Sequence, residues 1–295
     1  MARLLMKNAS HIVTCDPSDT VYTDSNLLME DGVITYIGPE EQQAEEVIDA
    51  AGCIVYPGLI NTHHHLYQTF SRNLPQVQNL ELFDWLKALY EIWKNLDSQV
   101  IYHSSVTGMG ELMKNGCTTC FDHHYVFPQG QAEGLLDAQL AAAEDLGIRM
   151  YASRGSMDLS KKDGGLPPDS VVQTVDEILR DCQRAVETYH DPSRFSMRMV
   201  ALAPCSPFSV SEELLRQSAI LARDLGVRLH THLCETKDEE RFVRERCGMR
   251  PLEYMESLGW IGPDVWYAHG IHFNGRSCAV WRRPAPALPT VPSPT

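Results

Sequence analysis

The sequence lacks an excess of positive charge and lacks any long apolar run. Its 295 residues include 25 Lys and Arg but 39 Asp and Glu, which gives a net charge of -14 at pH 7. Nucleic-acid phosphates and anionic membranes are bound by clustered Lys and Arg, so this charge balance argues against a nucleic-acid polymer or a membrane as the partner. No apolar run is long enough to span a bilayer. An acidic surface is compatible with a small, neutral heterocycle as the substrate.

The sequence also lacks the cysteine density of a disulfide-stabilised scaffold. It contains nine cysteines, an odd number, in a chain much longer than such scaffolds. Reduced thiols in a cytoplasm are the simpler interpretation. The N-terminal stretch MARLLMKNASHIVTCDP has a basic start, but its apolar part is broken at Lys7 and Asn8. We therefore predict a first strand rather than a signal peptide, and a cytoplasmic protein.

Residues 1–56 carry short apolar stretches separated by turn dipeptides. Asp31 and Gly32 lie between two apolar runs, which is a strong signal for a β-hairpin. We expect a small N-terminal β domain over these residues, forming half of a composite β-sandwich.

From residue 57 onward, short apolar runs alternate with longer helical patterns, and several of these patterns end in glycine just before a strand. The six strands expected from this alternation are 53–60, 117–124, 148–154, 196–204, 227–235 and 265–272. The alternation implies a parallel sheet, and its length over 57–274 favours an α/β fold of the TIM-type (β/α) barrel over a doubly wound sheet. Closure needs eight strands, so we predict a barrel that is incomplete at its C-terminal end.

Residues 275–295 depart from this alternation. Five prolines fall within the last twelve residues, and proline is not accepted inside a helix or a central strand. We expect 275–295 to be a divergent, Pro-rich and disordered tail.

Polar residues follow the predicted strands at the ends where barrel enzymes build their active sites. In chain order, these residues are His63, His65, Asp122, His123, Arg154, His232, Glu235 and His269. Because the carboxyl ends of all barrel strands face one shared mouth, histidines far apart in the sequence are expected to converge there.

The histidine spacing indicates a metal site. Alternate residues at an extended strand end point the same way, so His63 and His65 face the mouth while His64 faces away. An HxH pair with a distant histidine, His232, is a reasonable zinc set. Glu235, three residues past His232, is near enough to take a proton from a metal-bound water and return it to a leaving amine.

The other histidines have less specific interpretations. For His269 alone, a role in the site and simple packing are equally favoured. His64 and His230 are interpreted as structural or supporting residues. For His123 and the neighbouring His124, local packing is the favoured interpretation.

The stretches PGLINTHHHLYQ, LHTHLCET and AHGIH resemble the amidohydrolase superfamily, in the branch of guanine, cytosine and adenosine-type deaminases and s-triazine hydrolases. This resemblance implies His63, His65 and His232 as ligands of one Zn²⁺ per chain, with Fe²⁺ or Mn²⁺ as alternatives. It implies Glu235 as the catalytic proton shuttle and His269 as the catalytic residue that orients the water or the substrate carbonyl. Barrels of this kind often associate, so a homo-oligomer is compatible with the resemblance, but the sequence does not specify the oligomeric state.

The resemblance further implies hydrolytic deamination of an amino-purine, with 8-oxoguanine converted to urate and ammonia as the first choice. Guanine, isoguanine and an s-triazine are the alternative substrates. Gln68 and Arg154 are candidate substrate-binding residues, although loop packing is slightly favoured for both.

One departure from the family pattern bears on activity. The family completes its metal site with an aspartate at the end of strand eight, in a stretch resembling GVDGSASND, and the resemblance here ends near Asn274. A reading-frame shift or a truncated gene would produce this pattern. The alternative to an active enzyme is therefore an inactive, truncated fragment that lacks the last aspartate of the metal site.

Overall fold

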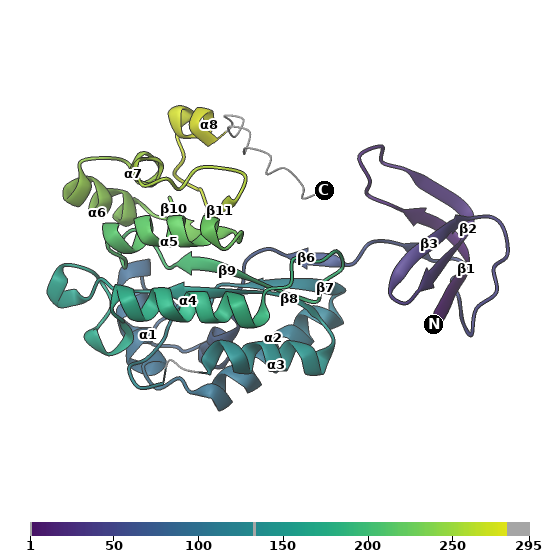
Figure 1. The fold of residues 1–295 in the computed structure, drawn as a ribbon, viewed down its shortest axis with the longest axis horizontal. Helices are drawn as coiled ribbons and strands as arrows, with labels where there is room; N and C mark the ends of the chain where they lie inside the picture. Colours follow the sequence, from purple (N-terminus) through teal and green to yellow (C-terminus); the bar gives the residue numbers. More distant parts are fainter. Residues whose placement is uncertain (1, 132–133, 282–295) are drawn as a thin grey trace, which may run out of the picture. The chain divides into compact units, whose positions relative to one another are not determined.

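The computed structural model describes residues 2–131 and 134–281, and these form two compact units, Met1–Leu59 and Ile60–Thr295. Figure 1 shows the elements of both units. Along the described parts of the chain, no helix combines the length and the apolar character needed to cross a membrane.

Unit 1 is a five-stranded sheet with the order β3-β2-β1-β4, and β5 also pairs with β1. Its strands are β1 (Arg3–Val13), β2 (Val21–Glu30), β3 (Val33–Gly38), β4 (Glu46–Asp49) and β5 (Ile54–Val55). The predicted hairpin is confirmed: Asp31 and Gly32 join β2 to β3 with φ values of 49° and 81°. Two consecutive residues with positive φ match the twist of a two-residue hairpin, and aspartate followed by glycine tolerates this conformation.

Unit 2 contains a curled parallel sheet of six strands with the order β11-β10-β9-β8-β7-β6. Its strands are β6 (Leu59–Asn61), β7 (Cys117–Asp122), β8 (Arg149–Ser156), β9 (Arg198–Pro204), β10 (Leu229–Leu233) and β11 (Val265–His269). The predicted TIM-type barrel architecture is confirmed over these six strands. Five of them, β7 to β11, fall where the alternation of apolar runs and helical patterns placed them. The expected strand 53–60 is divided instead: Ile54–Val55 form β5, which pairs with β1 of unit 1, and β6 begins only at Leu59.

Helices follow the strands and cover the sheet. They are α1 (Leu82–Trp93), α2 (Ser98–Lys114), α3 (Leu135–Leu146), α4 (Val175–Tyr189), α5 (Glu212–Asp224), α6 (Lys237–Cys247), α7 (Pro251–Ser257) and α8 (Gly275–Trp281), with 3-10 turns η1 (Leu66–Ser71), η2 (Lys161–Asp163) and η3 (Asp169–Val171). Side chains of Asp97, Thr174, Ser211 and Thr236 cap α2, α4, α5 and α6 by accepting hydrogen bonds from backbone N–H groups of the first turn.

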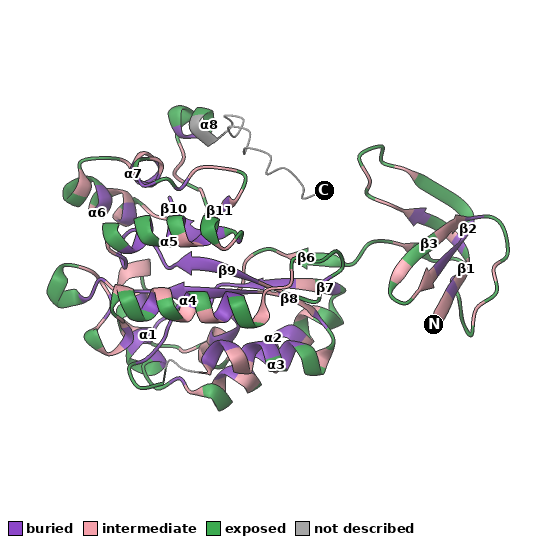
Figure 2. Ribbon diagram, in the orientation of Figure 1, coloured by how far each residue is buried: buried purple, intermediate pink, exposed green. Residues whose placement is uncertain are grey.

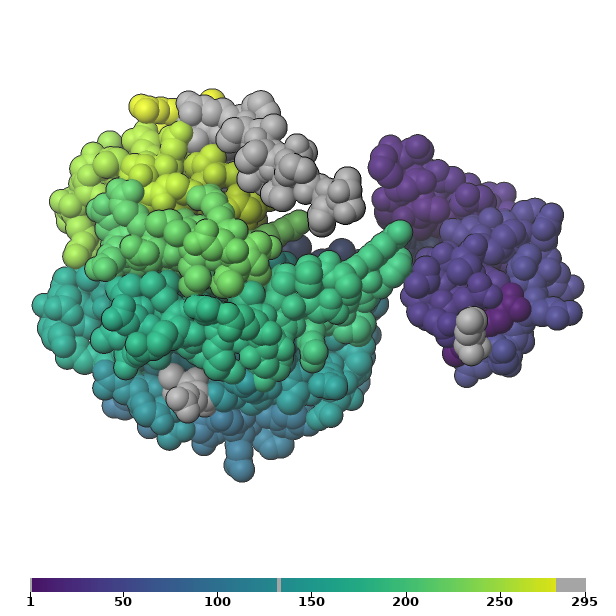
Figure 3. Space-filling model, in the orientation of Figure 1, coloured from purple at the N-terminus to yellow at the C-terminus, as the bar shows by residue number. Residues whose placement is uncertain are grey.

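The main core lies between the sheet and these helices. Every residue of β10 is buried, as is the carboxyl half of β9, whereas the outward faces of α4 and α5 are exposed (Figure 2). In the space-filling view, α4 and α5 almost hide the strands behind them (Figure 3). Burial on both faces explains why these strands read as short, continuous apolar runs in the sequence.

The segment after Asn274 differs in part from the expected disordered tail, because Gly275–Trp281 form α8. The Asn274 Oδ1 atom accepts hydrogen bonds from the backbone N–H and the hydroxyl of Ser277, which caps this turn. After Asn274, the first proline is at position 284, so no proline interrupts the helix over residues 275–281. The five prolines themselves lie outside the described residues.

Candidate metal centre

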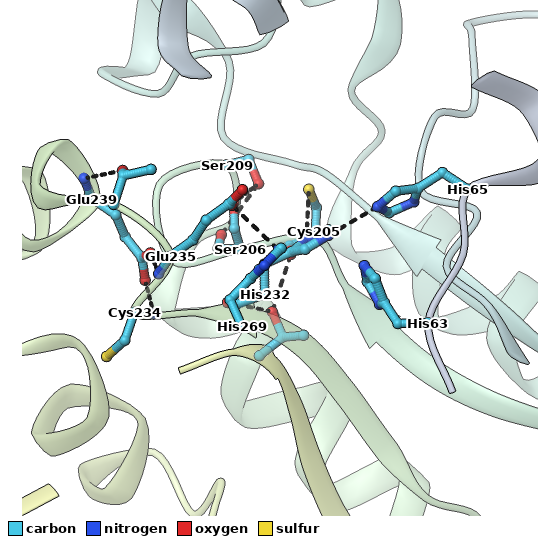
Figure 4. Close-up of polar contacts among 12 residues, drawn as sticks. His63, His65, Cys205, Ser206, Ser209, His232, Cys234, Glu235, Glu239 and His269 are labelled. Carbon is cyan, nitrogen blue, oxygen red and sulfur yellow. Dashed lines mark hydrogen bonds and ion pairs between the residues drawn. The ribbon is translucent and has the colours of Figure 1, made fainter. Parts of the chain in front are cut away.

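The curl of the sheet brings histidines from non-adjacent strands together. His63 and His65 follow β6, while His232 belongs to β10, four strands away in the sheet order. The ring centroids of His63 and His232 are nevertheless 5.0 Å apart, and those of His65 and His232 are 5.1 Å apart. Figure 4 shows His63 and His65 on one side of His232 and Glu235 on the other.

Backbone carbonyls determine which ring nitrogen carries the proton in His65 and in His232. The Nδ1 atom of His65 donates to the carbonyl of His123 at 2.7 Å, and the Nδ1 atom of His232 donates to the carbonyl of Cys205 at 2.7 Å. A carbonyl only accepts, so both Nδ1 atoms carry the proton and both Nε2 atoms present lone pairs. These two Nε2 atoms lie 3.2 Å apart. Two nitrogens bound to one tetrahedral zinc at ordinary bond lengths are about 3.3 Å apart, so the pair fits a shared cation.

His63 is oriented through a second histidine. The Nδ1 atom of His230 donates to the carbonyl of Trp266 on β11 at 3.1 Å, which leaves its Nε2 atom as an acceptor. The Nδ1 atom of His63 donates to this acceptor at 2.9 Å. The Nε2 atom of His63 therefore carries no proton and presents a lone pair. It is buried without a hydrogen-bond partner among the described residues. A buried nitrogen acceptor that has no partner and lies beside two further acceptors is typical of a metal-ligating histidine.

The pKa values of these imidazoles favour their neutral, ligating forms. Burial lowers the pKa of His63 to about 4, and burial also holds the pKa values of His65 and His232 well below the ordinary value. A neutral imidazole is the form that coordinates a metal.

His123 belongs to this cluster, although its sequence favoured local packing. Its ring stacks on that of His232 with centroids 4.5 Å apart, and nitrogen atoms of His63, His123 and His232 lie within 4.8 Å of one another. Its Nε2 atom donates to the carbonyl of Ala203 at 2.9 Å, and its Nδ1 atom is buried without a partner in the described structure. The available signal was its position immediately after β7. His124, by contrast, is fully buried against the ring of Phe127.

The loop that carries the HxH pair is held by the end of β7. The buried carboxylate of Asp122 accepts a hydrogen bond from the backbone N–H of Leu66 at 2.6 Å and another from Gln139 at 2.7 Å. The Nδ1 atom of His64 lies 3.9 Å from the same carboxylate. His64 is thus directed to Asp122 and away from His232, in line with the alternation expected of the strand end.

Glu235 and His269 meet beside the histidine cluster. The Nε2 atom of His269, at the end of β11, lies 3.6 Å from the Oε2 atom of Glu235. Cys234 and His269 both have left-handed backbones, with φ values of 54° and 74°. Burial, together with the negative charge of Glu239, raises the pKa of Glu235 to about 7. A carboxyl group with this pKa both accepts and donates a proton near neutral pH.

Of the two candidate substrate-binding residues, only Gln68 lies beside the cluster. Its amide nitrogen donates to the hydroxyls of Tyr67 and Tyr125 at 3.2 and 3.4 Å. The ring of Tyr125 in turn contacts the His65 ring, with centroids 5.3 Å apart.

Arg154, the other candidate, lies in the core. Its side chain is fully buried, pairs with Asp181 on α4, donates to Gln173 at 2.7 Å and lies over the ring of Phe127. Each of the three guanidinium nitrogens has an acceptor within the protein, namely Asp181, the carbonyl of Gly155 and Gln173, and this arrangement favours a structural role over substrate binding. Its position at a strand end was correct, but the acidic residue on α4 that draws it away is not visible from local sequence.

A large cavity of the described structure lies elsewhere. Its volume is about 1360 Å³, and its lining includes Asp137 on α3, Glu177 and Arg184 on α4, and Gln173. None of the residues that line it is a predicted site residue. Cavity size therefore does not identify the chemistry, whereas the convergence of unpaired imidazole nitrogens does.

The model of the amidohydrolase family matches residues 54–285. The chain belongs to the amidohydrolase family. This match covers the whole six-stranded sheet together with the histidine cluster, Glu235 and His269. The family is metal-dependent, in agreement with the orphaned imidazole nitrogens.

Individual relatives agree with this assignment. The chain is 45% identical over 278 residues to 8-oxoguanine deaminase of Pseudomonas aeruginosa, covering 93% of this chain and 61% of that protein. It is 40% identical over 292 residues to hydroxydechloroatrazine ethylaminohydrolase of a Pseudomonas species, covering 95% and 60%. The structure of an atrazine chlorohydrolase from Arthrobacter aurescens TC1, complexed with zinc, matches with a TM-score of 0.90 at 31% identity, covering 94% and 63%. The chain thus spans about three fifths of the relatives that it matches.

Proposed function

We propose that this protein is a zinc-dependent aminohydrolase that deaminates an amino-purine, with 8-oxoguanine converted to urate and ammonia as the first choice. The observation that carries the proposal is the 3.2 Å approach of the unprotonated Nε2 atoms of His65 and His232. The ring of His63, whose buried Nε2 atom has no partner among the described residues, lies 4.7 and 5.0 Å from theirs, and the pKa of the nearby Glu235 carboxyl group is raised to about 7. The similarity to a purine deaminase and to hydrolases of triazines supports chemistry at a C–N bond of a planar heterocycle.

In this proposal, His63, His65 and His232 hold the metal, and His123 packs against His232. All three proposed ligands are nitrogen donors, which suit zinc, while iron(II) and manganese(II) are the alternatives. A zinc ion held there supplies a nucleophilic water at neutral pH.

Glu235 moves the proton. Its ionised carboxylate accepts a proton from the attacking water, and the resulting carboxylic acid donates that proton to the departing amino group. The second proton of the water ends on the ring nitrogen next to the reacting carbon, so that neutral 8-oxoguanine plus water gives uric acid plus ammonia, with one proton passing through Glu235. His269, 3.6 Å from the Glu235 carboxylate, holds this side chain toward the cluster and orients the substrate carbonyl or the water.

In this proposal, the Gln68 side chain hydrogen-bonds the heterocycle; its contacts with Tyr67 and with Tyr125, whose ring lies against His65, support the assignment. Guanine, isoguanine and an s-triazine present similar planar amino-heterocycles and remain the alternative substrates. The preference for 8-oxoguanine rests on the 45% identity to the deaminase of that base. A homo-oligomer and a cytoplasmic location stay predictions.

A second candidate is a chain that binds metal without turnover. It is favoured by the composition of the cluster: the group of potential ligands found in the described structure consists of histidines alone. Without a carboxylate ligand, the site lacks a second base next to the water.

The deciding experiment measures metal content and turnover together. The purified chain is assayed for zinc by atomic absorption and then offered 8-oxoguanine, guanine, isoguanine and a hydroxylated s-triazine while ammonia is measured. About one zinc per chain, with ammonia release fastest from 8-oxoguanine, supports the first proposal. Zinc without ammonia from any substrate supports the second, and ammonia release that survives complete removal of the metal contradicts both.

A further inference from the structure

Glu239 is a fully buried acid that the proposed mechanism does not use. It is the third residue of α6, and both oxygens of its carboxylate accept backbone hydrogen bonds. The Oε1 atom accepts from the N–H of Cys234 at 2.8 Å, and the Oε2 atom accepts from the N–H of Glu235 at 2.7 Å. The carboxylate therefore holds the backbone on which the proposed proton shuttle is carried (Figure 4).

The pattern Thr-x-x-Glu begins both α4 and α6, but its glutamate has different hydrogen-bond partners in the two helices. At the start of α4, Thr174 and Glu177 form an ordinary capping box, in which the Glu177 carboxylate accepts from the backbone N–H of Thr174 itself at 2.9 Å. At the start of α6, the Thr236 hydroxyl caps the helix by accepting from the N–H of Glu239 at 3.2 Å. The Glu239 carboxylate, however, reaches past Thr236 to the two preceding residues. Glu239 thus stabilises the turn before the helix rather than the helix end.

This turn contains a strained residue. Cys234 has a φ of 54°, in the left-handed region that residues with a Cβ atom rarely adopt. Two charge-assisted hydrogen bonds to a buried carboxylate offset this strain, because such bonds are roughly twice as strong as neutral ones. The left-handed residue changes the chain direction after β10, and the next side chain, Glu235, meets His269.

We propose that Glu239 is a positioning residue whose carboxylate fixes the Cys234–Glu235 turn and thereby aims the Glu235 side chain at His269. This inference rests on the role proposed above for Glu235. It adds a residue of α6 that acts on the proton transfer only through Glu235.

The charge of Glu239 has a second effect on Glu235. A buried negative charge disfavours ionisation of a neighbouring carboxyl group, so Glu239 adds to the effect of burial in raising the Glu235 pKa. The other titratable groups that face Glu235 are His269 from β11, Cys205 after β9 and Tyr125 after β7. Removing the charge of Glu239 is therefore expected to lower the pKa of Glu235, which a purely structural residue would not do.

The test compares Glu239→Gln with Glu245→Gln. Glu245 lies on the same helix but is exposed, so it loses the same charge far from the turn. The Glu235 carboxyl is titrated by ¹³C NMR in metal-free protein labelled at glutamate, and its signal is assigned by its loss in Glu235→Gln. We expect the Glu235 pKa to fall in Glu239→Gln and to stay unchanged in Glu245→Gln. In zinc-loaded protein, kcat for ammonia release should fall about tenfold or more in Glu239→Gln alone, with KM little changed.

Glu239→Asp separates position from charge, since it keeps the charge and withdraws the carboxylate by one methylene group. It should leave the Glu235 pKa raised while lowering kcat, and it tests the inference even if Glu239→Gln fails to fold. A folded Glu239→Gln with an unchanged Glu235 pKa, or a Glu239→Asp with the full kcat, overturns the inference. The NMR titration needs neither substrate nor metal. A chain without turnover would therefore contradict the proposed function while leaving this titration to decide the role of Glu239.

Discussion

His65 and His232 face each other with their Nε2 atoms 3.2 Å apart, and neither atom carries a proton to share. Both protons are committed to backbone carbonyls on the opposite sides of the rings. Two lone pairs at this distance repel unless a cation lies between them. The relationship links residues 167 positions apart, and it exists because the sheet curls enough to bring the end of β6 near the end of β10.

Removing either nitrogen of this pair should abolish metal binding. We expect His65→Ala and His232→Ala to reduce bound zinc from about one per chain to nearly none, with ammonia release lost in parallel, because a closed set of imidazoles binds zinc far more tightly than an incomplete one. Atomic absorption after dialysis measures the zinc. His103→Ala, at an exposed position on α2, is the control and should retain both zinc and activity. Full zinc occupancy in His65→Ala would mean that His123 replaces it as the ligand.

The hydrogen bond between His230 and His63 predicts that His230 affects the zinc affinity, although His230 is not itself a proposed ligand. His230→Leu removes the acceptor that keeps the proton on Nδ1 of His63, so zinc affinity should fall by roughly 10–100-fold. His230→Gln offers an amide oxygen in its place and should lose less. Competition with a chromophoric chelator measures both dissociation constants. Equal affinity in the leucine variant and the unaltered protein would show that the hydrogen bond has no role in binding.

The raised pKa of Glu235 predicts the pH dependence of turnover. Glu235 must be ionised to accept the proton of the attacking water, so kcat/KM should rise with pH. The midpoint of this limb should lie between the ordinary value of 4.5 and about 7, since a bound cation offsets part of the effect of burial. The limb should disappear in Glu235→Gln, which should keep its zinc. A rate that is independent of pH from 4 to 8 would rule out Glu235 as the base.

The same pKa shift predicts a change in stability that needs no substrate. Between pH 4.5 and about 7 the folded metal-free chain holds a proton on Glu235 that the unfolded chain has released. This carboxyl group therefore contributes less to stability as the pH rises through that window. Chemical denaturation at pH 5 and pH 7 should show that Glu235→Gln gains free energy of unfolding, relative to the unaltered chain, at the higher pH. A constant difference between the two proteins would contradict the shift.

The sequence predicted the strands and the HxH alternation well, because both depend on local periodicity. His63 and His65 fall on one side of their strand end and His64 on the other simply because side chains alternate. The hydrogen-bond partners could not be predicted in this way. Whether His123 packs or faces the cluster depends on a carbonyl of β9, and the orientation of His63 depends on His230 and a carbonyl of β11. Local sequence does not specify which backbone atoms a curled sheet will bring beside a ring.

Arg154 illustrates the same limit and gives the last prediction. Arg154→Met keeps most of the side-chain volume over Phe127 but leaves Asp181 with Arg184 as its remaining cation. Loss of the buried Arg154–Asp181 ion pair should lower the free energy of unfolding by about 2–4 kcal/mol. The KM for the purine should change less than about twofold, because the guanidinium is enclosed by α4 and does not reach the cluster.

Arg184→Met is the matched control, because this arginine pairs with the same Asp181 but is half exposed. It should cost about 1 kcal/mol or less, since solvent screens the pair. Urea denaturation of the metal-free chains measures both losses, and steady-state ammonia release measures KM. A tenfold rise in KM for Arg154→Met with unchanged stability would restore Arg154 as a substrate-binding residue. The opposite outcome, a large loss of stability with KM unchanged, assigns this strand-end arginine to the fold, where it joins β8 to α4.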